Sequence, residues 1–222
     1  MTEFSEDPVT IRSMATKTLT ASTATAVGTT SAMASSKSAA RLERLGLTVL
    51  AATIIAVAAA FDIGHEDVFA RTKLRVALAG AALLVLLVLW AGARARGRWQ
   101  LPDILVGGYV GWSLLAFVAA SDLGTQWVGE QYQFQGMASV VIYGVMYAAA
   151  RRFVTSVERL VVFTWWLLAA GTHAAVYGVI QRLDLDPIWD TLLDGRVFST
   201  IGNPNTLASV LVVALPLGIL HI

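Results

Sequence analysis

The sequence predicts an all-α fold, a bundle of membrane-spanning helices with five complete spans and a sixth that is truncated at the C-terminus. Hydrophobic residues make up 56% of the 222 positions and charged residues only 14%, whereas a soluble domain usually carries about a quarter charged residues. The apolar residues are gathered into long uncharged stretches. In lipid such stretches form helices, because each helix satisfies its own backbone hydrogen bonds.

Five stretches have the length of a membrane span, and they occupy residues 45–61, 76–93, 104–121, 131–150 and 160–181. A spanning helix needs about 20 mostly apolar residues, which each stretch reaches once its flanks are counted. A sixth apolar stretch begins near Leu207 and reaches Ile222 in mid-membrane. We therefore expect 41–222 to be the N-terminal half of a longer transmembrane domain. A re-entrant segment and a helix that simply stops are the alternatives.

Residues 1–40 are rich in Ser, Thr and Ala and show no apolar period. Such a segment buries too little apolar surface to offset its chain entropy, so we expect a disordered cytoplasmic tail. A transit peptide is the alternative, and the early acidic residues Glu3, Glu6 and Asp7 count against it.

Charges in the loops predict the orientation of the helices. Basic residues concentrate before the first span, after the second and between the fourth and fifth: Arg41, Arg44, Arg94, Arg96, Arg98, Arg151, Arg152 and Arg159. The opposite loops are acidic: Asp62, Glu66, Asp67, Asp122, Glu130, Asp184, Asp186, Asp190 and Asp194. Because basic loops stay in the cytoplasm, we expect a cytoplasmic N-terminus and an external loop after the fifth span. Three basic residues before the second span contradict this pattern: Arg71, Lys73 and Arg75.

Within the fifth span, His173, Tyr177 and Gln181 follow one another at intervals of four and share a helical face. Polar residues in lipid normally point into the bundle, where they serve either a functional site or hydrogen bonds between helices. The histidines are far apart in sequence and cysteine is absent, so we expect no metal site and no cofactor. The basic residues are scattered between apolar runs, which argues against nucleic-acid binding.

The loop after the fifth span ends in a segment typical of a helix start. Gly202 permits a tight turn, Asn203 is a good N-cap, and Pro204 suits the first helical position. Free N–H groups and the positive dipole end at such a start attract anions, and the Arg196 guanidinium suits a diphosphate. These residues predict a docking site for an anionic lipid headgroup. A well-capped helix beside a solvated arginine is the alternative.

The same region resembles the O-antigen ligase and polymerase family of bacterial membrane glycosyltransferases. The resemblance rests on Gly178-Val-Ile-Gln181, a following acidic and Pro-containing loop, the stretch Arg196-Val-Phe-Ser-Thr-Ile-Gly-Asn-Pro-Asn205, Ala208 and Pro216. It implies transfer of a glycan from an undecaprenyl-diphosphate carrier, on the outer face of the plasma (inner) membrane, to lipid A core or to a growing polysaccharide. Arg196 would then contact the donor diphosphate, while Gly202, Asn203, Pro204 and Asn205 would shape the loop and helix start.

The resemblance also implies that the catalytic residues lie beyond residue 222, so that this fragment alone is inactive and only the full-length protein is an enzyme. A non-catalytic membrane scaffold or truncated remnant remains an alternative. A transporter is a further alternative, but the apolar stretches carry no Asp, Glu, Lys or Arg that would mark an ion path.

Overall fold

The computed structural model describes residues 38–63, 68–92, 99–129, 135–186, 188 and 196–220. The chain divides into two compact units, Met1–Leu42 and Glu43–Ile222. Residues 1–37, which make up most of the predicted tail at 1–40, lie outside the described residues. The described residues form seven helices without a β-sheet, which confirms the all-α class.

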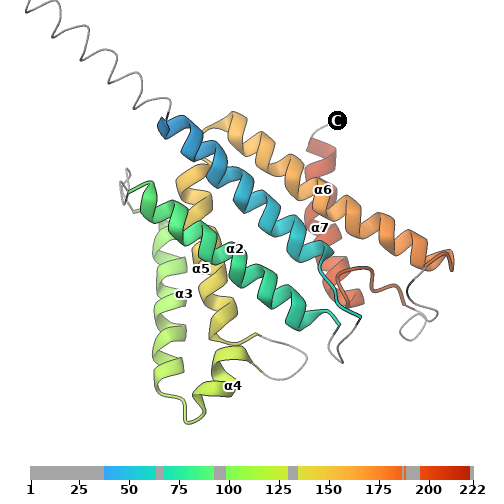
Figure 1. Cartoon of the computed structure of the whole chain (residues 1–222), viewed down its shortest axis with the longest axis horizontal. Coiled ribbons are helices and arrows are strands. Elements are labelled where there is room, and N and C mark those ends of the chain that lie inside the picture. The colour runs from blue at the N-terminus through green and yellow to red at the C-terminus, as the bar shows by residue number, and fades with distance from the viewer. Residues whose placement is uncertain are drawn as a thin grey trace, which may run out of the picture. The chain divides into compact units, whose positions relative to one another are not determined.

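Figure 1 shows the order of the helices along the chain. An N-terminal helix spans Ser38–Ala59. It is followed by α2 (Ala70–Trp90), α3 (Leu101–Val118), the short α4 (Leu123–Val128), α5 (Met137–Phe153), α6 (Val157–Arg182) and α7 (Pro204–Leu220).

Four of these helices are long and apolar enough to cross a membrane: the N-terminal helix, α2, α3 and α6. This supports a membrane protein, but the predicted count of five complete spans and a truncated sixth is not confirmed. The expected fourth span is shorter than its apolar stretch, since α5 begins only at Met137, after the extended Gly136, and has 17 residues. Its last turn contains Arg151 and Arg152, which further lowers its apolar length.

The N-terminal helix packs against α2 through small residues. A Cβ added to Gly80 would collide with the Thr53 side chain, so glycine permits the close approach of the two helices. Lys73 of α2 donates from Nζ to the carbonyl oxygens of Val57 at 2.7 Å and Ala58 at 3.3 Å. These carbonyl groups lie in the last turn of the N-terminal helix, where the helix dipole is negative and partners are lacking. Lys73 therefore caps this helix, which gives one of the three contradictory basic residues a structural role.

The centre of the bundle lies between α2 and α5. Ala77, Ala81 and Ile142 are buried together there. On its other side, α5 contacts α3, whose N-terminal Asp103 accepts hydrogen bonds from Arg151 and Tyr147. Each side chain of α3 stays at least partly exposed, as expected of a helix whose apolar surface lies in lipid.

The last two helices, α6 and α7, cross each other in roughly opposite directions (Figure 1). A Cβ added to Gly171 would approach Cβ of Ala214 to 2.5 Å, and one added to Gly178 would lie 3.7 Å from Leu207. Pairing of glycine with a neighbouring side chain lets two helices approach closely, which is how helices associate in lipid. The contact of Gly178 with Leu207 thus holds the beginning of α7 against the later part of α6.

Candidate functional site

The segment that leads into α7 forms a tight, buried turn. The Gly202 N–H donates to the carbonyl oxygens of Phe198 at 3.0 Å and Ser199 at 3.3 Å. Gly202 has a φ of 86°, and Ser199, which carries a Cβ, has a φ of 54°. Left-handed conformations are unfavourable for residues with a Cβ and persist where surrounding contacts enforce them. The turn therefore depends on its neighbours for its shape.

An aromatic cluster holds this turn against the ends of two other helices. The Phe198 ring, 3% exposed, lies edge-on to Phe69 with centroids 5.8 Å apart. Phe69 in turn lies 6.3 Å from Phe61, and Phe61 lies 6.5 Å from Tyr177 of α6. A Cβ added to Gly202 would collide with the Phe69 ring. The cluster thus joins the turn to α6 and to the connection between the N-terminal helix and α2.

Polar contacts attach the same turn to α6. The Ser199 N–H donates to Oε1 of Gln181 at 2.7 Å, and the Ser199 hydroxyl donates to the Ala174 carbonyl oxygen at 2.6 Å. Gln181 is 2% exposed and Ser199 is fully buried. Two further buried groups, Nε2 of Gln181 and Oγ1 of Thr200, have no hydrogen-bond partner among the described residues. The turn is therefore a buried polar site within an otherwise apolar bundle.

The three polar residues predicted to share a face of α6 lie in different environments. Gln181 is buried against the turn, whereas His173 is exposed. The Tyr177 hydroxyl donates to Oδ1 of Asp186 at 2.9 Å, and the same oxygen accepts the Ile188 N–H at 2.9 Å. The structure thus brings Tyr177 and Gln181 to the loop that follows α6 and leaves His173 apart from them.

The helix α7 begins at Pro204, as the sequence predicts. Oδ1 of Asn203 accepts the N–H groups of Asn205 at 2.8 Å and Thr206 at 3.4 Å. Pro204 has no N–H, and the Leu207 N–H already donates to the Asn203 carbonyl oxygen. The Asn203 side chain and carbonyl thus use the first N–H groups of α7, and attraction of an anion to this helix start stays a prediction. The positive dipole end remains.

Arg196 lies at the beginning of the described part of this segment, and its side chain is exposed. It immediately precedes Val197, whose Cγ1 would lie 3.1 Å from a Cβ added to Gly178. The neighbouring acidic residues Asp190 and Asp194 lie outside the described residues. Arg196 is thus an exposed guanidinium attached to a backbone that is packed from the next residue onward.

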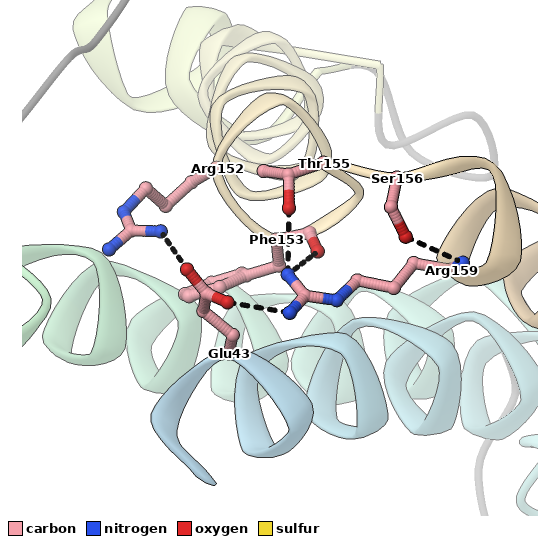
Figure 2. A network of polar contacts seen from close by, with 6 residues as sticks. All are labelled: Glu43, Arg152, Phe153, Thr155, Ser156 and Arg159. Carbon is pink, nitrogen blue, oxygen red and sulfur yellow. Dashed lines mark hydrogen bonds and ion pairs between the residues drawn. The ribbon is translucent and has the colours of Figure 1, made fainter. Parts of the chain in front are cut away.

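A second polar cluster lies where α5 passes into α6 (Figure 2). Glu43 of the N-terminal helix accepts hydrogen bonds from Arg159 at 2.6 Å and from Arg152 at 3.4 Å. Arg159 also donates to the Phe153 carbonyl oxygen at 3.3 Å and to the Thr155 hydroxyl at 2.7 Å. These ion pairs tie three helices together, the N-terminal helix, α5 and α6.

Sequence reasoning did not identify the pairing of Glu43 with Arg159 or of Asp103 with Arg151. Asp103 accepts from Nε and Nη2 of Arg151 at 2.8 and 2.9 Å, a bidentate pair. The sequence does contain a signal for these pairs. Glu43 and Asp103 both lie near clusters of arginine at the ends of predicted spans, and a carboxylate at such a place needs a cation as its partner. Among the described residues, no three His, Asp or Glu side chains gather in a way that would hold a metal ion.

Comparison with models of protein families found no match, and searches of curated proteins and of solved structures found none either.

Proposed function

We propose that this chain forms the donor side of a membrane glycosyltransferase that takes a glycan from an undecaprenyl-diphosphate carrier and transfers it to lipid A core or a growing polysaccharide. Arg196 is the residue that binds the diphosphate in this proposal. The observation that carries it is an exposed guanidinium at Arg196, two residues before the buried turn that leads into the start of α7. A guanidinium matches phosphate oxygens in a bidentate way, and the dipole end of α7 adds attraction for a negative charge.

The order of residues around this turn supports the same proposal. The stretch from Gly178 to Pro216, with Arg196 and Asn203 in it, resembles the O-antigen ligase and polymerase family. In the structure, Gly178 and Gln181 of this stretch contact the turn that follows Arg196. The resembling residues are therefore neighbours in space as well as in sequence.

Orientation in the membrane is part of the proposal. Arg152 and Arg159 lie with Glu43 where α5 passes into α6, and Arg196 follows the other end of α6. If the arginine-rich end is cytoplasmic, the Arg196 turn faces outward, where a periplasmic glycan donor is displayed. The capping role of Lys73 supports this orientation, because it gives a basic residue at the outward end a local structural partner.

The test is binding of undecaprenyl diphosphate to the chain in lipid nanodiscs, with undecaprenol as the neutral control lipid. Arg196→Ala is expected to weaken binding about tenfold or more, because a charge-assisted hydrogen bond contributes about 1.5–3 kcal/mol. The affinity of Arg196→Lys is expected to lie between those of the parent chain and Arg196→Ala, since lysine keeps the charge but loses the bidentate geometry. Arg182→Ala is the matched control, an exposed arginine at the end of α6.

Equal affinity of the parent and Arg196→Ala for undecaprenyl diphosphate would remove Arg196 from the site. Equal affinity of the parent for undecaprenol would show that the diphosphate is not recognised. In cells that make the glycan, Arg196→Ala is expected to abolish glycan transfer at an unchanged protein level. Normal transfer in that variant would contradict the proposal, and a parent chain that binds neither lipid would favour a non-catalytic scaffold.

A further inference from the structure

The contact between Gln181 and Ser199 connects α6 to the turn after Arg196 across 18 residues of sequence. Its hydrogen bond, 2.7 Å from the Ser199 nitrogen to Oε1 of Gln181, lies between two buried residues. A buried backbone N–H needs an acceptor, and here the acceptor is a side chain of another element. One of the contacts that hold the turn is therefore a single amide oxygen at the end of α6.

The backbone of Ser199 shows why this acceptor matters. Its φ of 54° is one that residues with a Cβ seldom adopt, and the N–H and hydroxyl of Ser199 both point to α6 in this conformation. The hydroxyl bond to Ala174 ends on a backbone carbonyl, which no substitution in α6 removes. The Gln181 bond is the one that a side-chain change can break, and its loss would leave the unfavourable φ without one of its two supports.

Packing carries this constraint from Ser199 back to Arg196. Phe198 is fixed edge-on to Phe69, and Val197 faces Gly178 across a gap that leaves little room for a Cβ. Three consecutive residues are thus held by α6 or by the aromatic cluster before the chain becomes exposed at Arg196. The backbone at Arg196 therefore leaves the bundle from a packed segment.

We infer that Gln181 is a positioning residue for Arg196, and that it acts through the backbone N–H of Ser199. The positional effect stands without any assigned activity; its consequence for a diphosphate ligand rests on the proposed function. Gln181→Met removes the acceptor oxygen and keeps the side-chain length, whereas Gln181→Glu keeps an oxygen that accepts the Ser199 N–H.

The position of Arg196 is measured directly by spin labelling, because the chain contains no cysteine. Labels are placed at Val157→Cys, exposed at the start of α6, and at Arg196→Cys, and the distance distribution between them is recorded in nanodiscs. A narrow distribution is expected with Gln181 and with Gln181→Glu, and a broadened or displaced one with Gln181→Met. Thr200→Val is the matched control, since it changes a buried polar group of the same turn that makes no hydrogen bond to a described residue.

A second measurement uses unlabelled chains with Arg196 intact and undecaprenyl diphosphate as the ligand. Gln181→Met is expected to weaken binding about tenfold, and Gln181→Glu to restore most of it. An unchanged distance distribution in a well-folded Gln181→Met chain would overturn the positioning role. If Gln181→Met does not fold, Gln181→Asn, which withdraws the amide by one methylene, replaces it with the same expected broadening. A broadened distribution together with a parent chain that binds no undecaprenyl diphosphate would support the positioning role and overturn the proposed function.

Discussion

Gly202 satisfies two separate requirements of the turn before α7. Its φ of 86° lies in the left-handed region, and a Cβ at this position would collide with the Phe69 ring. The sequence alone predicts the first requirement, because glycine before an Asn-Pro helix start indicates a tight turn. The second depends on Phe69, which comes from a distant connection and is brought there by packing.

Gly202→Ala is expected to lower the free energy of unfolding by about 1–3 kcal/mol, because alanine meets both the unfavourable φ and the Phe69 ring. Gly92→Ala measures the cost of the unfavourable φ without a collision, since Gly92 has a φ of 71° with open space around its Cβ position. Gly107→Ala, in α3 with open space, is expected to be neutral or slightly stabilising. Thermal unfolding in detergent measures all three, and equal stability of Gly202→Ala and Gly107→Ala would refute the packing argument.

At the scale of single helices, the start of α7 confirms a local prediction, while the anion site predicted from it stays a prediction. The sequence correctly predicts Asn203 as the cap and Pro204 as the first residue. The same cap occupies the N–H groups of Asn205 and Thr206, which an anion at this helix start would otherwise contact. A capping side chain and an anionic ligand compete for the same donors, so in the proposed site the anion is attracted by the helix dipole and by Arg196.

Two substitutions of the cap distinguish its roles. Asn203→Ala is expected to destabilise the chain by about 1 kcal/mol through loss of the cap, and to speed hydrogen exchange of the Asn205 and Thr206 amides. Asn203→Asp keeps the cap and the stability. Its added negative charge beside the helix start is expected to weaken undecaprenyl-diphosphate binding several-fold. Unchanged amide exchange in Asn203→Ala would contradict the capping geometry, and unchanged binding in Asn203→Asp would place the diphosphate away from α7.

At the scale of the whole molecule, α6 connects two chemically different ends of the bundle. Its 26 residues cover about 39 Å at 1.5 Å per residue, which exceeds the hydrocarbon core of a bilayer at about 30 Å. At its start, Arg159 pairs with Glu43; near its end, Gln181 holds the turn after Arg196. The ion pairs hold the first end together, while the second end presents an exposed arginine on a packed turn.

The sequence predicts the all-α class and the start of α7, because apolar length and capping chemistry are local properties. It does not predict that Arg159 meets Glu43 across 116 residues, or that Gln181 accepts a hydrogen bond from Ser199, since both depend on how helices pack. The shortening of α5 to a start at Met137 has a similar reason. The sequence from Glu130 to Gly136 contains three glutamines, and α5 begins only after the extended Gly136, which approaches Gly129 closely.

The orientation of the bundle is open to direct measurement, because a chain without cysteine accepts single reporter cysteines. Leu185→Cys lies in the loop after α6, and Val157→Cys and Trp99→Cys lie at the ends of the helices that we assign to the cytoplasm; the native side chains at all three positions are well exposed. A membrane-impermeant maleimide applied to intact cells is expected to label Leu185→Cys and to leave the other two unlabelled until the membrane is permeabilised. Labelling of Val157→Cys and Trp99→Cys from outside, with Leu185→Cys protected, would place Arg196 in the cytoplasm. An undecaprenyl-diphosphate donor displayed on the outer face would then be out of its reach, so this one experiment decides whether the proposed function is sterically possible.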